Sequence, residues 1–228
     1  MNNALLSLLQ ITDSTLPVGG YVHSAGLETY VQKGIINSKA TATEFVTQML
    51  SNNIKFTDAA LVSLAYDAAE ASNYKHIINL DEECSAVKLP KEIRFASQKL
   101  GMRLMKIFQP LCTSTIAEKY RQDVDLKNAA GHYSIVFGLY AHALNIPKPA
   151  ALHGFYYNAA AGMVTNCVKL IPLGQQDGQQ ILFSLQSIIQ HLVRESIEPN
   201  LALVGLCCAG FDIRCMEHEQ LYSRLYMS

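Results

Sequence analysis

Residues 13–30 organise the rest of the chain, and they read Asp13-Ser-Thr-Leu-Pro-Val-Gly-Gly-Tyr-Val-His-Ser-Ala-Gly-Leu-Glu-Thr-Tyr30. The first half contains Pro17, Gly19 and Gly20. This combination ends a preceding helix, because proline lacks a backbone donor and glycine allows a positive φ. The second half restarts a helix that His23 or Ser24 can cap. The stretch therefore predicts a tight connection between two helices.

Three interpretations of this connection stay open at the level of sequence. A glycine-rich turn before a helix can present N–H groups to an anion, although Gly19-Gly20 matches neither GxGxxG nor GxxxxGK[ST]. His23 and Glu28 are candidate catalytic side chains, although five residues of helix would separate them by about 140°. The third interpretation is a purely structural helix–helix turn whose histidine is satisfied by hydrogen bonds.

The composition favours a helical protein with an extensive core or a large partner surface. The chain has 228 residues, of which 50% are hydrophobic and 16% charged, and this length suits one domain covering residues 1–228. The formal net charge is −1, which gives no global basic field to attract nucleic acid or an acidic membrane. Nucleic acid and membrane are therefore not expected as partners.

The ends and the cysteines favour a cytoplasmic protein. The first ten residues lack a basic region and an A-x-A cleavage site, and the apolar run 201–211 falls short of the ~18–20 residues that span a bilayer. The six cysteines form no CxxC pair, which is typical of small buried hydrophobic side chains. Cys215 and His218 are a weak candidate for a metal-binding pair. No metal and no cofactor are expected.

Nearly every segment shows a period of 3.6 residues, which predicts an all-α, single-domain bundle of about ten helices. Residues 24–33 form one predicted helix, ended by Gly34. Further helices are expected to start at Thr41 or Thr43, at Thr57-Asp58, just after Pro90 and near Ser114. The pattern also predicts helices over 79–87, 131–144 and 150–170, and a single one from Asp177 to about Glu195.

Four motifs together resemble one known family. The first stretch resembles the pattern D-S-x-x-P-x-G-[GA]-F-S-H-S-[FY]-G-L-E, from which Tyr21, Val22 and Ala25 depart. The helix after Pro90 contains an E-x-R…x-G-x-R pattern, and residues 172–179 resemble P-L-G-Q-[TS]-x-G-Q. The last residues resemble H-E-x-x-x-x-R-L-F-x-S. In this order, the motifs resemble the UreF family of urease accessory proteins.

The resemblance implies an all-helical homodimer without catalytic activity of its own. It implies binding to the UreD-type accessory protein, also called UreH, and to the nickel-carrying UreG-type GTPase. Through that complex the family helps to insert nickel into apo-urease, coupled to GTP hydrolysis. The residues that the resemblance marks as partner-binding are Pro17, Gly19, Gly20, His23, Ser24, Gly26, Glu28, Arg94, Gly101, Arg103, Pro172, Gly174, Gln175, Gly178, Gln179, His218, Glu219, Arg224, Leu225 and Tyr226.

Two further expectations concern the alternatives. Residues 215–228 are expected to be a partner-binding tail, because a disordered end has little reason to be rich in leucine and tyrosine; the alternative is a tail that docks on its own core. The competing function is an all-helical enzyme that uses His23, Glu28 or His218. A deep, closed pocket lined by those residues would favour the enzyme, and a broad dimer surface would favour the adaptor.

Overall fold

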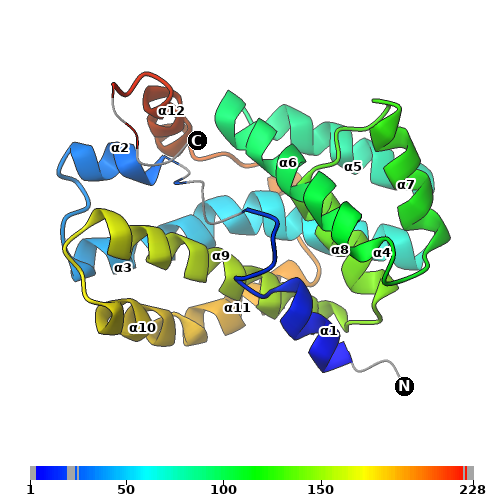
Figure 1. Cartoon of the computed structure of the whole chain (residues 1–228), viewed down its shortest axis with the longest axis horizontal. Helices are drawn as coiled ribbons and strands as arrows, with labels where there is room; N and C mark the ends of the chain where they lie inside the picture. Colours follow the sequence, from blue (N-terminus) through cyan, green and yellow to red (C-terminus); the bar gives the residue numbers. More distant parts are fainter. Residues whose placement is uncertain (1–3, 20–23, 25, 223, 225–228) are drawn as a thin grey trace.

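The computed structural model describes residues 4–19, 24, 26–222 and 224, and within them the fold is all-α, with no β-strand (Figure 1). The first half contains α1 (Ala4–Ile11), α2 (Leu27–Gln32), α3 (Lys39–Gln48), the π-helical segment η2 (Met49–Ala59), α4 (Ala60–Glu70), α5 (Tyr74–Val87), α6 (Lys91–Phe108) and α7 (Thr115–Asp125). The second contains α8 (Tyr133–Ala143), α9 (Lys148–Leu170), α10 (Gln175–Ser184), α11 (Gln186–Ser196), the 3-10 turn η3 (Leu201–Leu203) and α12 (Ala209–His218). The predicted fold class and the single domain are confirmed.

Helices α4 and α8 form the centre of the molecule. Every residue of α8 from Ser134 to Ala141 is buried, and α4 contributes small side chains to the contact. A Cβ atom at Gly138 would lie 2.6 Å from the carbonyl oxygen of Val62 and 2.9 Å from the Cβ atom of Ala65. The glycine therefore lets the two helix backbones approach closely, and this small-residue face is used inside the chain.

The other helices form two groups, one beside the α4–α8 pair and one along α9 (Figure 1). Helices α5, α6 and α7 lie beside α8, whereas α3, α10 and α11 pack along the long helix α9. A Cβ atom at Gly101 of α6 would lie 2.0 Å from the carbonyl oxygen of Gly131. This glycine therefore allows the loop before α8 to lie directly against the backbone of α6.

The expected helix start at Thr57-Asp58 is wrong. The chain stays helical from α3 through η2 into α4, and both Gln48 and Ala60 have right-handed helical φ and ψ. Thr57 is buried inside this run, where its hydroxyl donates to the carbonyl oxygen of Asn53 at 2.8 Å. A threonine hydroxyl can bond the preceding helical turn as well as cap a new helix, so its position alone did not mark a start.

Two other boundaries differ from the expectation. Helix α3 begins after Ser38, whose hydroxyl accepts from the amide of Thr41, while the Thr41 hydroxyl accepts from the Ser38 amide. The helix expected from Asp177 to Glu195 is two helices, α10 and α11, separated at Leu185. The buried Leu185 side chain holds this break against the core. Residues 79–87, in contrast, are confirmed as helical within α5.

The cysteines only partly follow the expectation of buried thiols. Cys84, Cys167 and Cys215 are buried, whereas Cys207 is exposed, and all six are free. Burial raises the pKa of Cys84 and of Cys167 to about 12, so these two thiols stay protonated near neutral pH. Across the residues that the structure describes, no helix is both long enough and apolar enough to cross a membrane.

Candidate functional site where the two ends of the chain meet

The first motif and the last motif of the sequence pack directly against each other, as α2 and α12 (Figure 1). Gly26, at the start of α2, has φ +77° and lies against Cys215, where an added Cβ atom would be 2.8 Å from the cysteine Sγ. Any other residue there would be strained by its φ and would clash with α12. The Thr29 hydroxyl donates to the carbonyl oxygen of Arg214 at 3.1 Å, so α2 also holds the backbone of α12.

His218 lies at the centre of this contact, with an exposed fraction of 0%. Its Nδ1 is 2.7 Å from Oε2 of Glu92 on α6, and its Nε2 is 3.2 Å from Oε2 of Glu28 on α2. The Ser24 hydroxyl is 3.4 Å from the same Nε2. Arg224 donates to the other carboxylate oxygen of Glu92 at 2.6 Å. These five residues are called the His218 cluster below.

The chemistry of the His218 cluster is that of a compensated ionic group. An ionised carboxylate can only accept hydrogen bonds. In this contact Glu28 and Glu92 meet the two ring nitrogens of His218, and Glu92 also accepts from the Arg224 guanidinium. A buried ion pair of this kind is strongly destabilised when one partner is removed. The cluster therefore ties α2, α6 and the end of α12 together.

The arginines of the α6 motif contact backbone carbonyls of this chain. Arg94 donates to the carbonyl oxygens of Lys88 and Leu89, at 2.9 and 3.2 Å, and so stabilises the turn before its own helix. Arg103 donates to the carbonyl oxygen of Val18 at 2.9 Å, which fixes the first motif on α6. Arg103 is thus the residue of this pair that contacts the first motif.

The second motif, at residues 172–179, lies elsewhere, at the junction of α9 and α10. The Asp177 carboxylate accepts from the backbone amide of Gly174 at 3.1 Å and pairs with Lys39 of α3 at 3.2 Å. A Cβ atom at Gly178 would lie 3.0 Å from Val168, so this glycine seats α10 on α9. Pro172, Gln175 and Gln179 are exposed. The motif thus has a structural half and a solvent-facing half.

The remaining predicted site residues fall into two sets. Pro17 is exposed, Gly19 is buried with φ +81°, and Glu219 is half-buried at the end of α12. Gly20, His23, Leu225 and Tyr226 lie outside the described residues.

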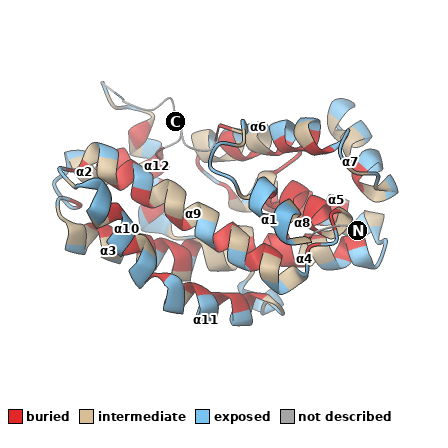
Figure 2. Ribbon diagram, turned by 60° about the horizontal axis from the view of Figure 1, so that its bottom comes forward, coloured by how far each residue is buried: buried red, intermediate tan, exposed pale blue. Residues whose placement is uncertain are grey.

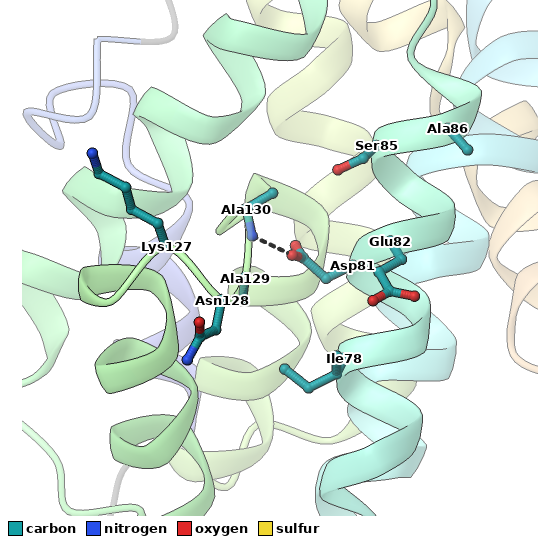
Figure 3. A pocket seen from close by; sticks show the side chains of 9 residues that line it. All are labelled: Ile78, Asp81, Glu82, Ser85, Ala86, Lys127, Asn128, Ala129 and Ala130. Carbon is teal, nitrogen blue, oxygen red and sulfur yellow. Dashed lines mark hydrogen bonds between the residues drawn. The ribbon is translucent and has the colours of Figure 1, made fainter.

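Two shallow cavities lie away from the His218 cluster. The larger, of about 530 Å³, is lined by Ile78, Asp81, Glu82, Ser85, Ala86 and residues 127–130 (Figure 3). The other, of about 470 Å³, is lined by Tyr157, Gln179, Gln180, Leu182, Phe183 and Gln186. Neither cavity is lined by Glu28 or His218, which the enzyme interpretation would require.

A second buried histidine lies beneath the larger cavity. His132 has an exposed fraction of 0%, and its ring nitrogens contact the hydroxyls of Ser85 at 2.8 Å and Ser97 at 3.1 Å. Burial lowers the pKa of His132 to about 4, so the ring is neutral at physiological pH. His132 therefore belongs to the core.

Asp81 holds the loop that carries His132. Its carboxylate accepts from the Tyr120 hydroxyl at 2.6 Å and from the backbone amides of Ala130 and His132 at 2.5 and 3.1 Å. The bond from Ala130 is drawn in Figure 3, where Asp81 points from α5 toward the loop. Asp81, Tyr120, Ser85, Ser97 and His132 are called the His132 cluster below.

The described residues contain no group of three or more histidine, cysteine, aspartate or glutamate side chains arranged to hold a metal ion. Cys215 and His218, the weak metal-binding candidate, instead contact Gly26 and two carboxylates. Sequence reasoning missed Glu92 and Asp81 as organising residues. Glu92 stands inside the E-x-R pattern and was the available signal, whereas nothing in the sequence around Asp81 marks it.

The fold and the site thus define a class: an all-α protein in which a buried ionic cluster joins an N-terminal motif to a C-terminal one.

The comparisons with known proteins give the family. Residues 36–186 match the UreF family model. Urease accessory protein UreF of Actinobacillus pleuropneumoniae serotype 5b is 45% identical over 97% of this chain and 98% of its own length. The protein of the same name from Haemophilus influenzae strain PittEE is 46% identical over 97% and 94%. That from Bacillus sp. strain TB-90 is 34% identical over 99% and 100%. The chain belongs to the UreF family of urease accessory proteins.

Proposed function

We propose that this chain is a non-catalytic adaptor that binds the UreD/UreH-type and UreG-type accessory proteins and assists GTP-dependent insertion of nickel into apo-urease. One observation carries the proposal: Glu28 and His218, from motifs 190 residues apart, meet in the His218 cluster. Glu219 follows His218 directly, and Arg224 contacts Glu92 of the same cluster. Motif residues that converge on one surface suit a shared partner site, and that surface can position the GTPase and regulate it.

The adaptor is favoured over the enzyme by the state of its candidate catalytic groups. Both ring nitrogens of His218 face carboxylates of the chain itself, and Glu28 is 5% exposed. A general base has to reach a substrate proton within hydrogen-bonding distance, and these groups are already engaged under the surface. Nickel is then a cargo of the assembled complex.

Within this proposal the chain acts as a cytoplasmic homodimer. Gly138 offers no surface for a dimer contact, because α4 covers it. The region of α9 around residues 159–162 can offer one, since an added Cβ atom at Gly162 would meet no atom within 4 Å. Exposed apolar side chains such as Tyr157 and Phe183 lie on α9 and α10. Apolar surface of this kind is typical of protein contacts.

Co-purification tests the proposed function. Tagged UreD-type and UreG-type proteins are mixed with the purified chain, with and without GTP and nickel, and we expect a stable complex that activates apo-urease. Arg224→Glu should weaken capture because it reverses a charge at the shared surface, whereas His191→Ala on the exposed side of α11 is the control. Failure of the wild-type chain to bind either protein would refute the adaptor function.

A further inference from the structure

Helix α6 concentrates positive charge in a nearly neutral protein. It carries Lys91, Arg94, Lys99, Arg103 and Lys106 and a single acid, Glu92, which gives 5 − 1 = +4. The whole chain has a formal charge of −1, so the rest carries −1 − 4 = −5. One helix therefore presents a basic surface on an otherwise acidic molecule.

The one acid of α6 does not neutralise this surface. The Glu92 carboxylate lies 2.7 Å from Nδ1 of His218 and 2.6 Å from the Arg224 guanidinium. It therefore pairs within the His218 cluster and not with the lysines of α6. Lys91, Lys99 and Lys106 are exposed, and within the described part of the chain none of them forms an ion pair. Five other lysines do have carboxylate partners: Lys33, Lys39, Lys55, Lys88 and Lys148.

Two large apolar side chains lie among these lysines. Phe95 is 44% exposed and Met102 is 47% exposed, and their spacing of seven residues puts them on one side of the helix. Lys91 and Arg94 lie over the Phe95 ring, with Nζ and Cζ 5.8 and 6.0 Å from its centroid. Figure 2 shows α6 at the edge of the molecule, with its buried residues turned inward.

We propose that the surface formed by Lys91, Phe95, Lys99, Met102 and Lys106, the α6 face, docks an acidic amphipathic segment of a partner protein. Apolar side chains of that segment cover Phe95 and Met102, and its carboxylates pair with the lysines. The proposal rests on the proposed adaptor function, because it supplies the chemistry of one partner contact. The α6 face lies on the same helix as the E-x-R…x-G-x-R motif. The fixed residues of the four sequence motifs are not part of it.

Charge and size favour a short protein segment over nucleic acid. Lys91 and Lys106 are separated by about 22 Å along the helix, at 1.5 Å per residue. An acidic segment of that length contacts α6 alone, whereas a longer polyanion also meets the −5 of the remaining surface. Phosphate binding gains nothing from an exposed methionine, but a protein interface does.

The test uses two double variants and one single variant of the full chain. Lys99→Glu with Lys106→Glu reverses the charge, and Phe95→Ala with Met102→Ala removes the apolar contact. Lys75→Glu, at an exposed lysine of α5, is the matched control. The probes are the UreD-type and UreG-type proteins, with binding measured by interferometry and folding checked by circular dichroism.

We expect each double variant to weaken binding of one probe by about tenfold or more while Lys75→Glu stays within about twofold. The charge effect should shrink in high salt, since added ions screen exposed charges over about 8–10 Å. A glutamate-to-lysine exchange in the acidic segment of that probe should restore binding to the charge-reversed variant. Unchanged binding by both double variants would overturn the α6 face and leave the adaptor function intact. Binding of single-stranded DNA that depends on the same lysines would overturn the choice of a protein partner.

Discussion

Two buried histidines with the same exposed fraction of 0% lie in opposite chemical surroundings. His218 faces carboxylates on both ring nitrogens, whereas His132 faces the hydroxyls of Ser85 and Ser97. The first links carboxylates of α2 and α6, and the second stays neutral in the core. Burial alone therefore does not determine the role of a histidine. The polar groups that contact its two ring nitrogens determine that role. The His218 cluster joins the chain ends, and the His132 cluster holds the centre.

The strongest way to break the His132 cluster is to remove its carboxylate. Asp81→Ala leaves the Tyr120 hydroxyl and the amides of Ala130 and His132 without their acceptor. We expect the free energy of unfolding to fall by about 3–5 kcal/mol, since buried donors without partners are costly. Urea denaturation measures the change. Glu82→Ala, at the exposed neighbour that lines the same cavity, should cost less than about 0.5 kcal/mol; equal losses would contradict the assignment.

Acid should act on the same cluster through His132. Its pKa is about 4 in the folded protein against 6.5 ordinarily, so the unfolded chain binds the proton more readily. Stability is therefore full above pH 6.5 and falls as the pH drops from 6.5 toward 4, by at most about 3 kcal/mol. The measurement is the free energy of unfolding against pH for wild type and His132→Asn. An identical slope for both proteins between pH 6.5 and 4 would argue against a neutral buried ring.

The His218 cluster should respond more locally. His218→Ala leaves Glu28 and Glu92 facing each other without their shared partner, and we expect a loss of about 2 kcal/mol. Hydrogen exchange should speed up in α2 and α12 and stay unchanged in α8, because the core packing is untouched. His191→Ala, at a histidine whose side chain is 67% exposed, is the control. Faster exchange in α8 would show that the cluster supports the whole fold.

The sequence carried the local signals of the fold well. Pro90 marked the start of α6, Gly34 ended α2 with φ +69°, and Ser114 capped α7 through the amide of Ala117. Each of these depends on backbone geometry that a single residue dictates. The all-α class followed from the periodicity of the whole chain.

Signals that depend on distant contacts could not be read in the same way. The break at Leu185 has no proline or glycine, and the buried leucine fixes it through packing. Thr57 resembles a residue that caps the start of a helix, but it lies inside a continuous helical run. Its hydroxyl donates to the carbonyl oxygen of Asn53 in the preceding turn. Glu92 organises the site only through its contact with His218, which lies 126 residues away in the sequence. The motifs named most residues of the site, but only their packing showed which ones meet.

Removal of residues 224–228 is the finest test of the comparison, because it changes the His218 cluster only at its edge. Of these residues the structure describes Arg224, whose one-third exposed side chain pairs with Glu92. A partly exposed ion pair contributes about 1 kcal/mol or less, so the midpoint of thermal unfolding should shift by only a few degrees. Glu92 keeps His218 as a partner, and α12 should stay in place. Capture of the UreD-type protein should nevertheless be lost, since residues 215–228 are expected to be a partner-binding tail and this protein is one of the two proposed partners. Glu92→Gln, which weakens the same pair and leaves residues 224–228 present, is the matched control and should retain capture.

If the truncated chain loses much of its thermal stability and still binds the partner, then the terminal residues belong to the fold.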